Sequence, residues 1–106
     1  MPFVKIEDSV SKELFAGFHG KFIHSDNMTF AWWDIEAGSE LPPHSHPHEQ
    51  VANVLEGTFE MTIDGQTHLL EPGTMAVIPS NAVHSGKAIT ACRILDVFQP
   101  VREEYR

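Results

Sequence analysis

Short apolar runs, rich in β-branched and aromatic residues, follow one another along most of the chain and predict strands. These runs cover residues 28–35, 51–57, 58–63, 67–70, 75–79 and 92–98. Turn-forming residues separate them, and Asp64-Gly65 between two of the runs predicts a two-residue hairpin. Only SVSKELFAGF, residues 9–18, is compatible with a helical turn, which Ser9 or Ser11 would cap. Many short strands in one small chain predict an all-β sandwich or barrel.

The last of these runs, CRILDVF, places an acid in an apolar row. Its residues alternate between the two faces of a strand, so Asp96 shares a face with Cys92, Ile94 and Phe98. A carboxylate on an apolar face needs a cation, a metal-bound ligand or a hydrogen-bond donor beside it. If this face lines a cavity, Asp96 is a candidate general acid or base. The alternative is a structural role, in a backbone turn or a pair with Arg93.

Composition and charge exclude several classes of protein. The 106 residues suffice for one domain, residues 1–106, and 15 acidic against 7 basic side chains give a net charge of -8. Nucleic acid and anionic membrane surfaces are therefore poor partners. The lone Cys92 excludes an internal disulfide, and no segment resembles a signal peptide or a membrane span, which predicts a cytoplasmic protein. Because Trp32 and Trp33 are neighbours, one of them must face outward, and an apolar outer face predicts a homodimer.

The stretch LPPHSHPHEQ, residues 41–50, offers several side chains that could bind a metal ion. His44 and His46 are two positions apart, so an extended strand would direct both rings to one side, with Gln50 on the same side. His84, which follows the turn-forming PSNAV, is the candidate for a ligand from elsewhere in the chain. Taken alone, the histidines fit ordinary surface or core positions as well as they fit a metal site.

The other residues of this stretch receive different expectations. His48 follows Pro47 in a bend and is expected at the rim of the pocket, where it would contact substrate. The alternatives are that it points into solvent or binds the metal. Glu49 has the opposite parity to the candidate ligands and is expected at the surface. The remaining histidines are expected to be exposed or hydrogen-bonded: His19, His24 and His68.

Glycine and proline spacing around these histidines resembles the two sequence motifs of the cupin family. The first motif is matched by Gly38, His44, His46, Gln50 and Gly57, and the second by Gly73, Pro79, Asn81 and His84. The segment between the motifs is as short as in compact single-domain cupins. The resemblance covers about residues 30–99. It implies a small antiparallel jelly-roll β-barrel with one divalent metal ion in its mouth.

Three positions depart from the cupin motifs, and one of them is Ala88, where the second motif often has asparagine. Asn81 stands where the second motif has glycine, and asparagine tolerates a left-handed turn better than most residues. Gln50 stands where glutamate is usual, so a donor set of His44, His46, Gln50 and His84 would be neutral. A neutral set favours a Lewis acid over an iron oxygenase whose ligands include a carboxylate. Zinc, manganese, iron, nickel and cobalt all accept such ligands.

Three longer segments, HSHPHEQ, IPSNAVHSGKA and CRILDVFQPVREEY, resemble the pectin-degradation protein family, the KdgF-like cupins of uronate catabolism. The resemblance implies ring opening of 4,5-unsaturated uronate monosaccharides, which are small anionic sugars. It implies that Asp96 is the acid/base, that Phe98 shapes the pocket and that Arg102 binds the uronate carboxylate. The alternatives are a metal-dependent cupin dioxygenase and a non-enzymatic sensor that binds a metal or a sugar.

Arg102 is also a candidate from its position alone. Pro100 should end or bend the last strand, so that the Arg102 side chain folds back over the pocket and offers a bidentate partner to a carboxylate. The alternative is a solvated tail with surface ion pairs.

Overall fold

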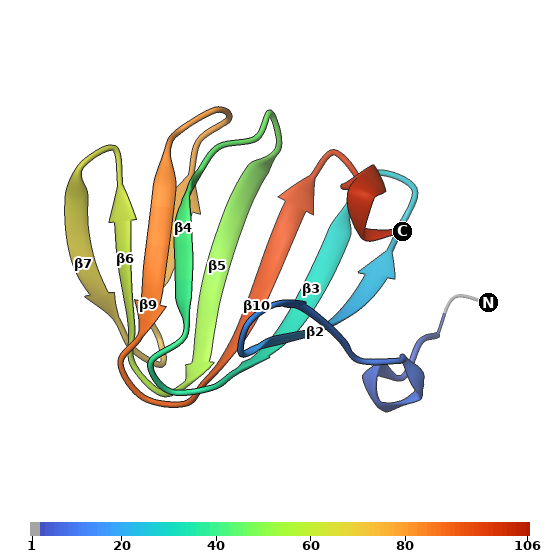
Figure 1. Cartoon of the computed structure of the whole chain (residues 1–106). Coiled ribbons are helices and arrows are strands. Elements are labelled where there is room, and N and C mark those ends of the chain that lie inside the picture. The colour runs from blue at the N-terminus through green and yellow to red at the C-terminus, as the bar shows by residue number, and fades with distance from the viewer. Residues whose placement is uncertain (1–2) are drawn as a thin grey trace.

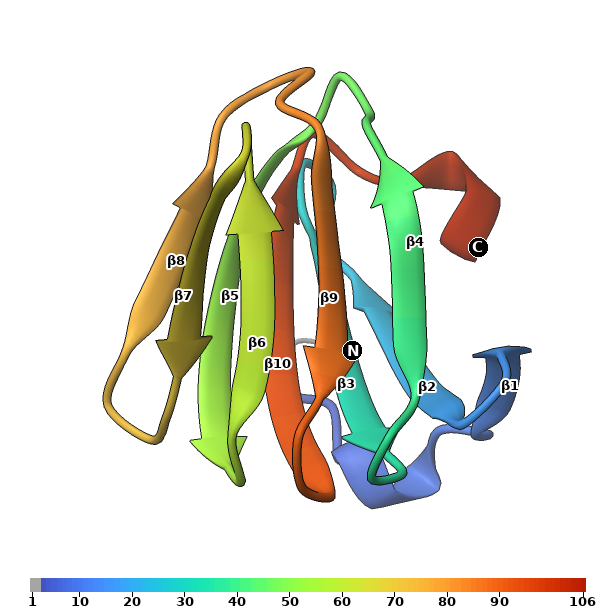
Figure 2. The same cartoon turned by 60° about the vertical axis from the view of Figure 1, so that its left-hand side comes forward.

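The computed structural model describes residues 3–106 and consists of two antiparallel β-sheets that face each other (Figures 1 and 2). One sheet has six strands, in the order β1 (Lys12–Phe15), β2 (Phe18–His24), β3 (Thr29–Ile35), β10 (Cys92–Gln99), β5 (Glu49–Glu56) and β8 (Met75–Ile78). The other has four strands, in the order β4 (Glu40–His44), β9 (His84–Ala88), β6 (Phe59–Ile63) and β7 (Gln66–Leu70). The all-β antiparallel architecture is as predicted.

Two three-residue 3₁₀ turns complete the described residues, η1 (Ile6–Asp8) and η2 (Glu103–Tyr105). No helix among residues 3–106 is long and apolar enough to cross a membrane.

The core lies between the sheets and follows the predicted alternation of β10. Its inward row, Cys92, Ile94, Asp96 and Phe98, is buried, whereas Leu95 and its odd-numbered neighbours face outward. The aromatic side chains Phe18, Phe59 and Trp33 fill the rest of the space with aliphatic residues. Trp32 points to the outer face, as its neighbour Trp33 requires. Asp96 is therefore an acid within an apolar core.

The helical turn expected in residues 9–18 is wrong. This segment forms β1 and the start of β2, joined by a hairpin at Gly17, whose φ of 82° lies in the left-handed region that favours glycine. The Gly17 N–H donates to Glu13 Oε2 at 2.9 Å, and the rings of Phe15 and Phe18 pack edge to face. Local hairpin chemistry and aromatic packing thus outweigh the weak helical preference. The helical turn lies earlier, at η1.

The predicted Asp64-Gly65 hairpin is confirmed. It joins β6 to β7, and both residues have positive φ, 47° and 81°, as the tight two-residue turn requires.

The apolar pattern missed β4 and β9 as well as β1 and β2, and β4 and β9 lie side by side. β4 contains Pro42 and Pro43, which cannot donate to a sheet, but β4 is an edge strand and tolerates them. β9 contains few apolar residues, and its Gly86 lies against Phe59. A Cβ at Gly86 would come within 2.2 Å of Phe59 Cε2, so only glycine fits this position without rearrangement.

Candidate metal centre

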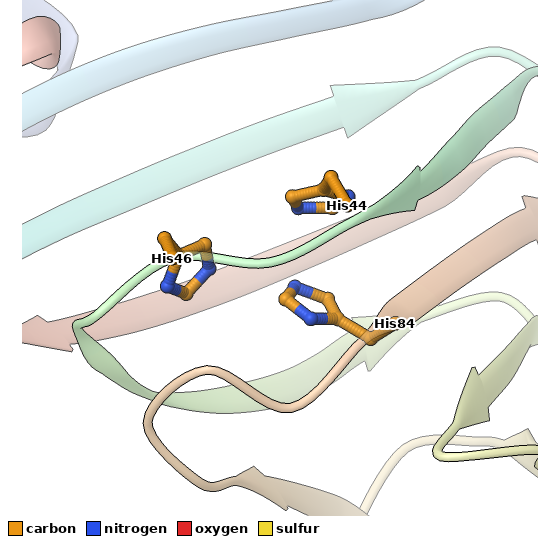
Figure 3. A group of neighbouring side chains, drawn as sticks. All are labelled: His44, His46 and His84. Carbon is orange, nitrogen blue, oxygen red and sulfur yellow. The ribbon is translucent and has the colours of Figure 1, made fainter.

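Three histidine rings gather where β4 and β9 meet the connection into β5 (Figure 3). His44 ends β4 and pairs with His84, which begins β9, while His46 lies in the connection and Gln50 lies in β5. The chain bends locally after His44, so His44, His46 and Gln50 do not share one extended strand. The ring centroids of His44 and His46 nevertheless lie 4.1 and 5.0 Å from that of His84.

The turn before β9 fastens the loop that carries His46. Asn81 has a φ of 65°, the left-handed conformation expected of this position, and its N–H donates to the His46 carbonyl at 2.8 Å. The Ser80 hydroxyl donates to the Pro47 carbonyl at 2.6 Å. The two motifs are thus joined by main-chain contacts next to the histidines.

Backbone carbonyls fix the tautomer of each ring in this cluster. In all three rings Nδ1 lies within hydrogen-bonding distance of a carbonyl oxygen. The pairs are His44 with Pro42 at 3.0 Å, His46 with His48 at 3.0 Å, and His84 with Ala82 at 2.9 Å. Because a carbonyl only accepts, each Nδ1 must carry the proton, and each neutral ring keeps its lone pair on Nε2. Metal-binding histidines are oriented by this kind of contact.

The Nε2 atoms have no competing role. His84 Nε2 is buried without a hydrogen-bond partner, and His46 Nε2 lies 3.1 Å from Gln50 Oε1. With Nδ1 protonated, Nε2 and the amide oxygen are both acceptors, and a shared cation would satisfy both. His44, His46 and His84 each offer a ligand atom, and these atoms lie within 4.8 Å of one another. The three histidines could therefore hold a metal ion, and Gln50 adds an oxygen donor of the kind that divalent ions accept.

Burial keeps two of these rings, His46 and His84, neutral. Burial lowers the pKa of His84 to about 4, and the other two histidines and Arg102 act in the same direction. Burial, followed by the Arg102 charge, also lowers the pKa of His46. Both rings therefore have a lone pair available for a metal near neutral pH.

Asp96 is the buried acid of the site. Trp33 Nε1 donates to its Oδ2 at 3.0 Å, whereas Oδ1 is buried and has no partner at hydrogen-bond geometry. Burial raises the pKa of Asp96 to about 6, although the nearby Gln50 amide and the Trp33 N–H lower it in part. The alternative pairing with Arg93 is wrong, because Arg93 bonds Asp34 at 3.1 Å on the outer face. Asp96 can thus gain or lose a proton close to neutral pH.

Arg102 folds back over the core, as its position after Pro100 predicts. Its side chain is only 10% exposed, so the solvated-tail alternative is wrong for this residue. The guanidinium carbon lies 4.9 Å from the Phe98 ring centroid and 4.2 Å from that of Tyr105. One guanidinium nitrogen, Nη2, donates to Glu104 at 3.2 Å, and Nε is buried without a partner.

One cavity joins these groups. It has a volume of about 60 Å³ and lies at the core between the sheets. The predicted site residues that line it are His44, Gln50, His84, Asp96, Phe98 and Arg102. Trp33 and Tyr105 also line it, and sequence reasoning missed both as site residues. The only signal for Trp33 was its inward position, and Tyr105 had none.

The remaining predicted positions lie outside the lining. His48 is half-buried, and its ring bonds the Val101 carbonyl at 3.2 Å, so contact with substrate stays a prediction. Glu49 is exposed, as expected. His19 bonds Glu36, His24 bonds Thr29, and His68 is exposed, in line with their expected structural or surface roles.

Comparison with known proteins agrees with this architecture. Residues 31–98 match the family model described as a cupin domain. The chain is 30% identical over 97 residues to the pectin degradation protein KdgF of Dickeya dadantii, which covers 89% of this chain and 88% of that protein. It is 29% identical over 82 residues to L-ectoine synthase of Hahella chejuensis, covering 74% and 62% of the two. The structure of KdgF from Halomonas sp. has the same fold, with a TM-score of 0.93 at 24% identity over 100% of this chain and 99% of that one.

Proposed function

The chain belongs to the cupin domain family, and from that premise we propose that it is a metal-dependent enzyme that opens the ring of 4,5-unsaturated uronate monosaccharides. The observation that carries the proposal is the free Oδ1 of a buried acid, Asp96, in one cavity with imidazole donors and an arginine. Similarity to a protein named for pectin degradation supports a sugar-derived substrate.

Four neutral side chains would hold the metal: His44, His46, Gln50 and His84. Their nitrogen and oxygen donors suit zinc, manganese, iron, nickel or cobalt. A divalent ion bound there supplies Lewis acidity toward an oxygen of the sugar, and a neutral donor set leaves its charge uncompensated.

Arg102 would bind the uronate carboxylate. Among the described residues that line the cavity it is the only arginine or lysine, and its buried Nε lacks a partner. A guanidinium in a partly dry cavity binds a carboxylate strongly, and this local attraction offsets the net charge of -8 that an anionic substrate meets. Phe98, buried beneath the guanidinium, gives the pocket an apolar wall.

Asp96 would move the proton. Its Oδ1 accepts the hydroxyl proton of the hemiacetal while the bond from that carbon to the ring oxygen breaks, which leaves an aldehyde and an enolate. Asp96 then delivers the same proton to the carbon of the enolate double bond, and the enolate becomes a ketone. The proton lost equals the proton gained, and no external oxidant or reductant is needed. A carboxyl with a pKa of about 6 is suited to both transfers.

The test is to incubate the purified protein with an unsaturated galacturonate or guluronate monomer and to follow the loss of its conjugated absorbance. Wild type should exceed the buffer rate and lose this excess when a chelator removes the metal. Asp96→Asn should abolish turnover but keep the metal, while Asp34→Asn on the outer face serves as the matched control. A wild-type rate equal to buffer would contradict the proposal, and oxygen uptake would indicate the dioxygenase alternative.

We also propose that the outer face of the six-stranded sheet pairs with a second copy of the chain. One apolar side chain from each of five adjacent strands lies in register across this face, in the order Ile23, Phe30, Val97, Val51 and Val77. Burying such a continuous row favours self-association. The chain has a net charge of -8, but no acidic side chain lies within the row, so the row itself places no negative charges opposite one another. Val77→Glu should give a monomer by light scattering, whereas Leu69→Glu on the other sheet should not. A monomeric wild type would contradict the pairing.

The cytoplasmic location stays a prediction.

A further inference from the structure

The segment that carries Arg102 is attached to the body of the protein through side chains. This C-terminal turn, Val101–Tyr105, follows β10 and lies beside the loop that joins β2 to β3 (Figure 1). Two histidine rings lie against its carbonyl oxygens. His24 Nε2 is 3.2 Å from the Tyr105 oxygen, and His48 Nε2 is 3.2 Å from the Val101 oxygen. Arg102 therefore lies between two tethered carbonyls.

The contact at His24 belongs to a chain of hydrogen bonds with one consistent direction. The Arg102 N–H donates to Thr29 Oγ1 at 2.9 Å, and Thr29 is fully buried. The Tyr105 carbonyl only accepts, so His24 Nε2 carries the proton and donates it there. In the neutral ring Nδ1 is then the acceptor, and the Thr29 hydroxyl, 2.8 Å away, donates to it. His24 and Thr29, which flank the β2–β3 loop, thus hold the turn at both its Arg102 and Tyr105 ends.

The contact at His48 connects the turn to the histidine cluster. The His48 ring donates to the Val101 carbonyl, while the His48 carbonyl accepts the Nδ1–H of His46 at 3.0 Å. One residue therefore touches both a candidate metal ligand and the residue before Arg102. The distance between the histidine cluster and Arg102 therefore depends on His48.

The guanidinium itself is held in one orientation. It lies over the rings of Phe98 and Tyr105, and its Nη2 bonds Glu104. Since Tyr105 belongs to the turn that His24 holds, loss of that contact would free the stacking partner of Arg102 as well as its backbone. A guanidinium that is free to move must be ordered again when it binds a carboxylate, and this weakens binding.

We infer that His24, acting through Thr29, and His48 are positioning residues that fix Arg102 for the carboxylate of an anionic sugar. The inference rests on the proposed function for the identity of the ligand, but the tethering of the turn does not. Neither histidine lines the cavity, so their effect would act through Arg102 rather than on the substrate.

His24→Ala tests this inference. Loss of the contact should raise KM for the unsaturated uronate about five- to tenfold and leave kcat within about twofold. Metal content should not change, and His24→Gln, which keeps an N–H donor, should recover part of the loss. His68→Ala, an exposed histidine on β7, is the matched control. In an Arg102→Ala background, His24→Ala should raise KM no further. An equal rise in both backgrounds would overturn the inference.

Two measurements do not depend on turnover. Hydrogen exchange should increase in the Val101–Tyr105 segment of His24→Ala, and calorimetric binding of saturated galacturonate should weaken about five- to tenfold. If wild type binds this sugar in a His24-dependent way but opens no unsaturated uronate, the proposed function fails and the positioning role stands. If exchange and binding are both unchanged in His24→Ala, or if wild type binds no uronate, the positioning role is wrong.

Discussion

Replacing Asp96 with asparagine should stabilise the metal-free protein at neutral pH. Burial raises the pKa of this carboxyl from 3.8 to about 6, so the folded protein holds the proton more tightly than the unfolded chain does. The stability that this proton confers is complete below about pH 3.8 and is lost as the pH rises through about 6. Roughly two pKa units, at about 1.36 kcal/mol each, give a loss of about 3 kcal/mol by pH 8.

Asparagine has nearly the same shape and no charge to bury. Its carbonyl oxygen can still accept the Trp33 N–H, so the variant should escape the pH-dependent loss. Its amide nitrogen takes the place of Oδ1, and any cost of burying that donor is the same at every pH. The free energy of unfolding of Asp96→Asn minus that of wild type should therefore grow by about 2–3 kcal/mol from pH 4 to pH 8. In thermal unfolding this corresponds to a midpoint shift on the order of 10 °C.

The assay is urea unfolding in the presence of a chelator, followed by tryptophan fluorescence at several pH values. Asp34→Asn, on the exposed face of β3, should show no such growth. A difference between Asp96→Asn and wild type that is the same at pH 4 and pH 8 would refute the reasoning. The predicted result would mean that the acid is kept at the expense of stability, as is common where activity requires a strained group.

Three further substitutions address the donors and the sheet beneath them. His84→Ala should remove most of the bound metal, as elemental analysis after dialysis would show. Because the pKa of His84 is lowered to about 4, the free energy of unfolding of the metal-free wild type should fall as the pH drops from about 6.5 toward 4. The same dependence on pH in His84→Ala would argue against this. Gln50→Glu adds a negative charge to the donor set and should tighten metal binding in calorimetric titration while lowering turnover; weaker binding would contradict it. Gly86→Ala brings a Cβ within 2.2 Å of Phe59 and should lower the free energy of unfolding by about 1–3 kcal/mol. An unchanged midpoint of urea unfolding would contradict this.

Sequence patterns predicted the parts of this molecule that local chemistry determines. The Asp64-Gly65 hairpin and the inward row of β10 follow from turn preference and from the two-residue period of a strand, so both could be predicted without tertiary information. Asn81 was likewise expected in a left-handed turn. The approach of His84 to the LPPHSHPHEQ stretch was predicted from its position after the turn-forming PSNAV and from motif spacing.

What escaped prediction depends on which strands become neighbours. The two prolines of β4 are tolerated only because β4 lies at the edge of its sheet. That position is known only from the order of the strands. The Trp33 N–H reaches Asp96 across 63 positions of sequence, and His24 reaches Tyr105 across 81. These pairs arise because β3 lies between β2 and β10, and no local pattern encodes that order.

The carbonyls that orient the three histidine rings belong to the main chain, and this affects how the site tolerates mutation. A side-chain replacement at Ala82 or His48 leaves the carbonyl in place, so ring orientation persists for as long as the chain keeps its path. An insertion or deletion in the β4–β5 connection would move the His48 carbonyl and disturb the His46 ring, and one between β8 and β9 would do the same to Ala82 and His84. Over evolutionary time the residues around the cavity can therefore diverge and acquire new substrates, while descendants inherit the same arrangement of imidazoles.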